Sequence, residues 1–557
     1  MEEHNTGAGI PNVLLRADFP EVQPTSSSRK RRCERWVLSL TQTELHLHKV
    51  NSDSSATHRL ALADCIGCRT FREDGDNQVT ICFSAVFYPL RKKGRGPSAT
   101  SSRKKVVKTF RVDSFEIFEK NQEIADIWAR KIKELSALSL DVTDGLLYGI
   151  LPQPSRVLIL LNPHSGKGQA LQLFHSQVLP MLNETEIQHK LIVTERQNHA
   201  HELIQEEDLS LWDAVIIMSG DGLMYEVLNG IMKRPDWETT IKKPLGILPG
   251  GSGNALAASI NHYSGHDNAV DEDLLINCTF FICKGLTAPM DLVSVTTSHR
   301  HMFSFLGVAW GFISDIDIES EKYRTIGSAR FTVGTFIRLT SLRVYRGRLS
   351  YLPANDDTGK QCKTSVDLEV NGFCHSLSCK QSTSTPNVNS QHMYNACNSN
   401  NLMKSHSSDS SIPFSKTTVA SGPLDSLAPP LSKPVPNHWT VSEEQDFILV
   451  LALYQSHLGD QFFTAPMAQP NDEVIHLFYV KAGISRTSLL KLFLAMEKGT
   501  HLESGCSHIV HIPVKAFRLE PFTPKGIITV DGEQVEYGPI QAEIHSRLGR
   551  FISGVCT

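Results

Sequence analysis

The sequence predicts a mixed α/β protein that carries additional β-rich parts before and after a parallel sheet. Three observations predict this fold class. Short strand-like stretches with one helix come first, apolar strands that alternate with helices occupy residues 152–285, and alternating apolar and polar residues dominate from residue 286 onward. Because 557 residues exceed one compact core, we expect several domains.

The N-terminal part is predicted to start with a disordered segment, residues 1–28, followed by a β module at residues 29–140. Its apolar strand-like stretches are residues 36–40, 44–48, 79–83 and 106–110. A helix at residues 121–138 follows and carries Trp128 on its apolar face. Strands closed by such a helix resemble a pleckstrin-homology module; the alternative is a generic β module used for interaction.

The α/β domain at residues 152–285 contains four apolar strands, at residues 156–161, 190–194, 212–218 and 245–248. They lack polar alternation, which predicts a parallel sheet covered on both faces. Three of the turns that follow strands are rich in glycine, at residues 162–168, 219–222 and 249–253. All three lie at carboxyl ends of strands, the edge where open α/β sheets bind ligands.

Three glycine turns at one edge indicate a phosphate site. A phosphate needs several backbone N–H donors, glycine lets the backbone approach it, and a following helix N-terminus adds its dipole. The chain lacks the motifs of P-loop kinases and of protein kinases. Asp221 lies within the second turn, where it can accept a proton from a hydroxyl group or bind Mg²⁺; a helix-capping Asp is the structural alternative.

Residues 286–353 and 437–557 are predicted to form a β-rich C-terminal domain, interrupted by helices near 319–342 and 485–498. Residues 354–436 are rich in Ser, Asn, Thr and Pro and carry few apolar side chains. We therefore expect a disordered insertion that regulatory protein kinases can phosphorylate.

The composition is that of a globular protein, with 40% hydrophobic and 20% charged residues. A net charge of −4 and 12 unpaired-looking cysteines argue against sequence-specific nucleic-acid binding and against a disulfide or zinc framework. No signal peptide or membrane-spanning run is expected, so we predict a cytoplasmic or nuclear protein. Basic runs at residues 29–32, 91–93 and 103–105 are either solvated surface, a nuclear signal or an attraction to anionic membranes at the periphery.

Residues 219–230, SGDGLMYEVLNG, and residues 248–257, LPGGSGNALA, resemble the diacylglycerol kinase-like catalytic domain. Ser219 in place of a first glycine, and residues 254–263, 309–324 and 493–499, are similar to sphingosine kinases in particular. The long N-terminal extension and insertion are most similar to the larger, second form of that family. The resemblance covers about residues 156–533 apart from the insertion.

The resemblance implies a lipid kinase that transfers the γ-phosphate of ATP, with Mg²⁺, to the primary hydroxyl of sphingosine and dihydrosphingosine. It implies Asp221 as general base, Asp317 as the partner of the cationic head, and a β-sandwich-like lipid-binding domain. The implied ATP contacts are Asn162, Pro163, His164, Ser165, Gly166, Lys167, Gly168, Thr194, Glu195, Arg196, Gln197, Asn198, Ser219, Gly220, Glu226, Gly251, Ser252, Gly253, Arg324, Arg330, Asp531, Gly532 and Glu533. The candidates for an apolar pocket are Phe303, Phe305, Ile313, Phe331, Leu492 and Met496.

Several of these residues have structural alternatives. Asp531-Gly532 is also the ordinary signal of a tight hairpin, and Arg324 and Arg330 are also compatible with surface charges. About half of the apolar candidates are expected to be core. His164 and Ser165 depart from the family pattern, which leaves the contacts of that loop open.

Two other functions remain open from the sequence. A ceramide or diacylglycerol kinase has the same kind of catalytic domain, but its substrate has no free amine for Asp317. A non-catalytic scaffold of the same fold is the second alternative, and the presence of Asp221 with all three glycine turns argues against it.

Overall fold

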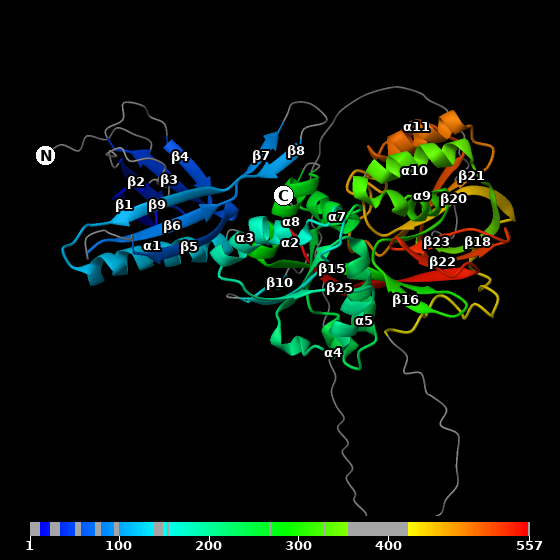
Figure 1. Cartoon of the computed structure of the whole chain (residues 1–557), viewed down its shortest axis with the longest axis horizontal. Helices are drawn as coiled ribbons and strands as arrows, with labels where there is room; N and C mark the ends of the chain where they lie inside the picture. The colour runs from blue at the N-terminus through cyan, green and yellow to red at the C-terminus, as the bar shows by residue number, and fades with distance from the viewer. Residues whose placement is uncertain are drawn as a thin grey trace, which may run out of the picture. The chain divides into compact units, whose positions relative to one another are not determined.

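The computed structural model describes residues 12–22, 34–50, 57–72, 79–93, 100–138, 149–152, 155–266, 269–327, 329–354 and 422–554. Within these ranges the chain is a mixed α/β protein, as predicted (Figure 1). The central part of the insertion, residues 355–421, and the basic run at residues 29–32 lie outside the described residues.

The N-terminal part consists of two antiparallel sheets, of order β1-β2-β3-β4 and β5-β6-β9, together with the hairpin β7-β8 and a long helix. The elements are β1 (Leu15–Pro20), β2 (Arg35–Leu40), β3 (Glu44–Lys49), β4 (Thr57–Ala61), η1 (Leu62–Asp64), β5 (Cys65–Phe71), β6 (Ile81–Phe87), β7 (Leu90–Lys93), β8 (Thr100–Arg103), β9 (Val106–Val112) and α1 (Phe118–Leu138). Trp128 of α1 is buried in the core that the two sheets form.

Strand β1 corrects the prediction that residues 1–28 are disordered. It pairs with β2 along its whole length, and Phe19 packs edge-on against Phe83 and Trp128, with ring centroids 5.4 and 5.6 Å apart. Leu15, Ala17 and Phe19 are buried or half-buried, and the exposed Arg16 and Asp18 alternate with them. The charged positions give the segment the polar composition that predicted disorder.

The parallel sheet is present in the order β12-β11-β13-β14, with helices after each strand. The elements are β11 (Arg156–Leu161), α2 (Ala170–Leu173), η2 (Phe174–Val178), α3 (Leu179–Glu184), β12 (Gln188–Val193), α4 (His199–Glu206), η3 (Leu209–Leu211), β13 (Ala214–Ser219), α5 (Asp221–Met232), α6 (Trp237–Thr240), β14 (Leu245–Pro249), α7 (Ala255–Tyr263) and α8 (Asp271–Lys284). Helices α5 and α7 begin within a few residues of the strands before them, so their N-termini lie at the carboxyl edge of the sheet.

The C-terminal strands are antiparallel, and they continue the same sheet. The elements are β10 (Gly149–Ile150), β15 (Leu286–Thr296), β16 (His301–Ser304), β17 (Gly307–Gly311), β18 (Tyr345–Pro353), β19 (Thr440–Val441), β20 (Gln445–Leu453), β21 (Ile475–Lys481), β22 (Ile509–Pro521), β23 (Ile528–Val530), β24 (Glu533–Val535) and β25 (Ile540–Ile552). Strand β25 runs parallel to β14 and antiparallel to β15 and β22. The regions predicted as separate domains, residues 152–285 on one side and residues 286–353 with 437–557 on the other, therefore share one sheet.

Helices on this half are α9 (Phe312–Glu319), η4 (Glu321–Ile326), α10 (Ala329–Thr340), α11 (Arg486–Met496) and η5 (His501–Ser504). Helix α9 packs on β17 and β20 and against α10 (Figure 1). The single helix predicted near residues 319–342 is divided, because Gly327 adopts a φ of 65° between η4 and α10.

The end of the predicted disordered insertion, residues 422–436, is instead packed on the sheet. Glu543 of β25 is 2% exposed and accepts hydrogen bonds from the N–H groups of Ser426, Leu427 and Ala428 at 2.8 Å each, and from the Ser426 hydroxyl at 3.0 Å. Arg518 of β22 donates to carbonyl groups in the same segment. Buried partners on the sheet thus order a segment whose own composition could not.

Two further observations concern membranes and charge. Among the described residues, no helix has both the length and the apolar character needed to cross a bilayer.

Arg103 of the predicted basic run 103–105 is buried, and its guanidinium donates to Asp64 at 2.8 Å and to the Tyr88 carbonyl at 2.7 Å. Lys105 of this run pairs with Glu184. This run is therefore a set of structural ion pairs rather than a free basic patch.

Glu543→Ala is expected to lower the free energy of unfolding by about 3 kcal/mol, because it leaves buried N–H groups of residues 426–428 without an acceptor. Glu444→Ala, which removes an exposed ion pair with Arg346, should cost less than about 1 kcal/mol. Urea unfolding followed by fluorescence measures both, and equal effects would contradict the structural role of residues 426–428.

Candidate active site

The three glycine turns meet at the carboxyl edge of the parallel sheet. A Cβ atom on Gly251 would lie 2.4 Å from the Cα of Gly220, and one on Gly166 would lie 2.6 Å from the Gly250 carbonyl oxygen. The Ser165 hydroxyl oxygen accepts from the Gly220 N–H at 3.1 Å and from the Ser219 hydroxyl at 3.2 Å. The third turn therefore touches the other two through backbone atoms that leave no room for a Cβ, and the Ser165 hydroxyl joins the first turn to the second.

Asp221 is the first residue of α5, yet its carboxylate binds the N-terminus of α7. It accepts from the N–H groups of Ala255 at 2.9 Å and Leu256 at 3.2 Å. Burial raises the pKa of the Asp221 carboxyl above its ordinary value, and these two donors oppose that rise. Asp221 therefore caps a helix, as the structural alternative predicted, but the capped helix is α7 rather than its own helix α5. These two hydrogen bonds fix the Asp221 carboxylate at the edge of the glycine turns.

A cavity of about 670 Å³ opens next to these turns. Its polar lining includes the glycine turns, the carboxylates of Asp221, Asp317 and Glu533, and other charged or polar side chains such as Arg330. The apolar lining residues are Leu223, Ala255, Leu306, Ala309, Ile313, Ile316, Ile318, Phe331, Leu451, Leu453, Leu458, Phe462 and Phe493. The cavity therefore suits a long apolar molecule with a polar end.

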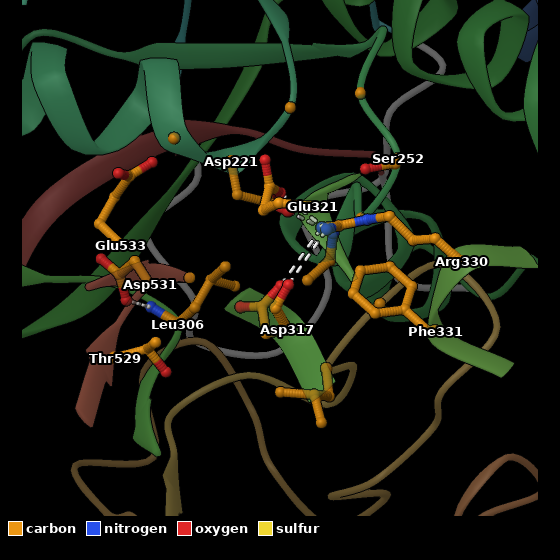
Figure 2. A pocket seen from close by; sticks show the side chains of 18 of the residues that line it. Asp221, Ser252, Leu306, Asp317, Glu321, Arg330, Phe331, Thr529, Asp531 and Glu533 are labelled. Carbon is orange, nitrogen blue, oxygen red and sulfur yellow. Dashed lines mark hydrogen bonds and ion pairs between the residues drawn. The ribbon is translucent and has the colours of Figure 1, made fainter. Parts of the chain in front are cut away.

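Asp317 of α9 and Arg330 of α10 form an ion pair inside the cavity. The Arg330 guanidinium lies 3.2 Å from Asp317 Oδ1 and 2.7 Å from Glu321 Oε1, and it stacks 4.2 Å from the Phe331 ring centroid (Figure 2). The pKa of Asp317 is raised to about 7, mainly by burial. Arg330 opposes this rise, and Glu321 and Glu533 add to it. Because the Arg330 side chain is only 6% exposed, the surface-charge alternative is wrong for it.

The segment 531–533 divides into a turn and a cavity residue. Asp531 and Gly532 have positive φ and connect β23 to β24, as the hairpin alternative predicted. The Asp531 carboxylate accepts from the Ser304 hydroxyl at 2.6 Å and from three backbone N–H groups of residues 305–307. The chain itself thus uses this carboxylate, whereas Glu533 reaches α5: a Cβ on Gly222 would lie 2.5 Å from Glu533 Oε1.

The residues after β12 line the other side of the polar end. Thr194 is buried and bonds to the Leu161 carbonyl, while Arg196 is exposed and pairs with Glu202. Glu226 of α5 faces N–H groups at the start of α4. Burial raises the pKa of Glu226, and these N–H groups oppose only part of that rise. No cluster of three or more His, Cys, Asp or Glu side chains within the described residues is arranged to hold a metal ion.

The structure brings most of the predicted site residues to this cavity. Those that line it are Asn162, His164, Ser165, Gly166, Thr194, Glu195, Arg196, Gln197, Ser219, Gly220, Asp221, Glu226, Gly251, Ser252, Gly253, Ile313, Asp317, Arg330, Phe331, Asp531, Gly532 and Glu533. The predicted residues that do not line it are Pro163, Lys167, Gly168, Asn198, Phe303, Phe305, Leu492 and Met496. The side chain of Arg324 lies outside the described part of the chain.

Four apolar candidates, Phe303, Phe305, Leu492 and Met496, do not line the cavity because they are buried in the core. Phe303, Leu492 and Met496 are at most 2% exposed and belong to the hydrophobic core, as does Phe305. Leu492 and Met496 pack in the same core cluster as Ile313, so they support the cavity wall from behind. Apolar character alone cannot distinguish the first layer of a pocket from the second.

Sequence reasoning missed a loop that closes the cavity. After β20, the chain returns to the third glycine turn, where the Asp460 N–H donates to the Gly253 carbonyl at 2.7 Å. His457 and Asp460 both line the cavity. Burial raises the pKa of Asp460 to about 7, with Asp271 and Asp221 adding to the rise. A polar His and Asp directly after a fully apolar strand, at residues 457 and 460, were the available signal.

Residues 156–295 match the family described as the diacylglycerol kinase catalytic domain. Human sphingosine kinase 1 is 49% identical over 407 residues, which cover 73% of this chain and 93% of that protein. Human sphingosine kinase 2 is 38% identical and covers 98% of this chain and 93% of that protein. The crystal structure of a putative diacylglycerol kinase from Bacillus anthracis has a TM-score of 0.45 at 17% identity, over 72% of this chain and 97% of that one.

Gly251→Ala is expected to push the second and third glycine turns apart, because the new Cβ would lie 2.4 Å from Gly220. We expect a loss of about 1–3 kcal/mol in unfolding free energy. A fluorescent ATP analogue should bind at least about tenfold more weakly, as for a displaced contact of 1.4 kcal/mol or more. Gly538→Ala, where nothing lies within 4 Å of the new Cβ, is the matched control and should change neither quantity measurably.

Proposed function

We propose that the protein transfers the γ-phosphate of ATP to the primary hydroxyl of sphingosine in this cavity, with Asp221 as general base. The chain belongs to the sphingosine kinase family. The chain is accordingly an ATP-dependent lipid kinase. The match to human sphingosine kinase 2 spans 98% of the chain, in agreement with the predicted resemblance to the larger form of the family.

One observation carries this proposal: a single cavity has phosphate-type glycine turns and a carboxylate at one end, a second carboxylate at its side, and apolar walls beyond. The test is transfer of radiolabelled phosphate from ATP to sphingosine, with dihydrosphingosine, ceramide and diacylglycerol alongside. Label on the two sphingoid bases supports the proposal. Label only on ceramide or diacylglycerol would reject it, and label on none of them would favour the scaffold alternative.

In the proposed reaction, the lipid hydroxyl oxygen attacks the γ-phosphorus while the bond from that phosphorus to the bridging oxygen of ADP breaks. Asp221 accepts the hydroxyl proton. Its two oxygens offer about four acceptor positions, and the α7 N–H groups occupy two of them, so positions remain for a hydroxyl. The same two donors oppose the rise that burial causes in the pKa of Asp221, and so favour the ionised form that a base needs.

The glycine turns supply the phosphate site in this proposal. The N-terminus of α5 and the turn at Ser252 and Gly253, which lines the cavity, present N–H groups and a positive dipole end to a triphosphate. The N–H groups of Gly220 and Gly251 instead hold the turns together, through Ser165 and Asn254. Mg²⁺ would arrive with ATP and be held by phosphate oxygens and one or two carboxylates, for which Asp221 and Glu533 have the right chemistry. When bound, the ion neutralises charge on the phosphates.

Asp317 is proposed to bind the ammonium group of the sphingoid base. It lines the cavity beside two apolar lining residues: Ile313, which is also on α9, and Phe331, which is on α10 next to Arg330. An amine at Asp317 directs the alkyl chain along that wall. Neutral lipids cannot form this charge-assisted contact.

The N-terminal part is proposed to be a pleckstrin-homology-like module, supported by its two antiparallel sheets and a closing helix with a buried Trp128. We also propose peripheral binding to membranes through α10, where Val333, Phe336 and Ile337 are 38%, 55% and 41% exposed. The same helix lines the lipid cavity through Phe331, so an apolar surface adjoins the cavity. Cytoplasmic and nuclear location stays a prediction.

Asp221→Asn is expected to lower kcat by about 10²–10⁴-fold, because an amide cannot accept the hydroxyl proton. The amide oxygen can still accept one α7 N–H, so the variant should fold and bind an ATP analogue with nearly unchanged affinity. Steady-state kinetics and nucleotide titration measure the two effects. Activity within tenfold of the parent protein would remove Asp221 as the base.

The efficiency kcat/KM for sphingosine is expected to fall about tenfold between pH 8 and pH 6. Asp317 has a raised pKa of about 7, so acid protonates it and removes the charge that binds the amine, whereas an aliphatic amine stays protonated across this range. The value of kcat/KM for ATP, measured at saturating sphingosine, should depend less on pH. Parallel pH profiles for both substrates would contradict the assignment.

Phe336→Asp is expected to weaken sedimentation with phosphatidylserine vesicles about tenfold, because an inserted aromatic side chain contributes about 1.5–3 kcal/mol. Leu211→Asp, on η3 and 48% exposed, is the matched control. Equal effects of the two substitutions would exclude α10 as the membrane-binding surface.

A further inference from the structure

Helix α10 is joined to the preceding α9 by two ion-pair clusters. In the outer cluster, Arg338 contacts Asp315 at 3.4 Å and Glu319 at 3.3 Å. The two acids are four residues apart, so they lie on the same face of α9. Arg343 contacts the same acids, at 3.5 Å from Asp315 and 3.4 Å from Glu319. None of these four residues lines the cavity.

The inner cluster repeats this arrangement inside the cavity. Arg330 contacts Asp317 at 3.2 Å and Glu321 at 2.7 Å, and these acids are again four residues apart. All three residues line the cavity, and Figure 2 shows the guanidinium between the two carboxylates. Arg330 also donates to the Asp317 carbonyl and to the Ser320 hydroxyl, both at the end of α9.

This arrangement poses an electrostatic problem for a cationic substrate. The ammonium group and the guanidinium of Arg330 would share one carboxylate, Asp317, and two cations at that separation repel each other. Arg330 is only 6% exposed, so losing its carboxylate partner would leave a charge with little access to water. Glu321 removes the problem because it is a second anion within direct contact of Arg330.

We propose that Glu321 is a positioning residue that retains Arg330 when the ammonium group of the substrate takes Asp317. This inference rests on the proposed function. With Glu533 also close enough to act on Asp317, three carboxylates then surround two cations. For a neutral lipid there is no second cation, and Arg330 stays paired with both acids.

The test compares Glu321→Gln with Glu319→Gln in the full-length chain. Both substitutions remove one carboxylate from an ion-pair cluster, but Glu319 belongs to the outer cluster, where Asp315 still contacts both Arg338 and Arg343. In Glu321→Gln, Arg330 has Asp317 as its one contacting carboxylate, so the KM for sphingosine should rise at least about tenfold, the effect of losing a hydrogen bond to a charged group. The KM for ATP should rise less than the KM for sphingosine, because Arg330, an expected ATP contact, keeps Asp317 as its partner when no sphingosine is bound. Glu321→Asp should restore most of the sphingosine KM.

Three results would overturn the inference: an unchanged sphingosine KM in Glu321→Gln, an equal rise in the KM values for sphingosine and ATP, or the same rise in Glu319→Gln. Thermal unfolding of all variants shows whether a loss of stability accounts for any change. The parent protein is assayed first. If it does not phosphorylate sphingosine, the proposed function fails; if it does and Glu321→Gln resembles Glu319→Gln, only the role of Glu321 fails.

Discussion

The contact between the backbones of Gly220 and Gly251 is the constraint on which the site depends. A methyl group at either position would meet the other turn at 3.2 Å or less, so the two turns can touch only as glycine. Their contact sets α5 and α7 side by side at their N-termini, which is why Asp221 of one helix reaches the first N–H groups of the other. Phosphate donors and the candidate base therefore come from one rigid arrangement of backbone.

A second set of contacts joins this polar edge to the apolar part of the cavity. The loop after β20 bonds to α7 through Ser456 and His457, and to the third glycine turn through Asp460. Strand β25 links the parallel and antiparallel strands into one sheet. Hydrogen bonds from backbone N–H groups, together with sheet pairing, make these links, so the apolar walls of the cavity are held in a fixed position relative to Asp221.

The sequence predicted what local pattern determines. Four apolar strands, three glycine turns and the position of Asp221 are each readable within about ten residues, and their shared edge follows from parallel topology. Contacts between distant residues were not readable. They include the pairing of β25 with β14, the four donors that occupy Asp531, and the order imposed on residues 422–436 by Glu543. Phe303 and Met496 failed as pocket candidates for the same reason, since only the fold decides which apolar residue faces the cavity.

The acidic residues of the cavity explain how one family can favour a cation among lipids with similar tails. Apolar walls bind alkyl chains with little discrimination, because burial of apolar surface is proportional to area. Discrimination must come from buried charge, whose removal from water is unfavourable unless a partner is present. Asp317 illustrates this: burial raises its pKa to about 7, so a cation that restores its ionised form gains a contact that a neutral lipid cannot offer. Under the proposed role of Asp317, selectivity for an amine would follow from a buried carboxylate that is paired with Arg330 in this structure and gains a second cation when the amine binds.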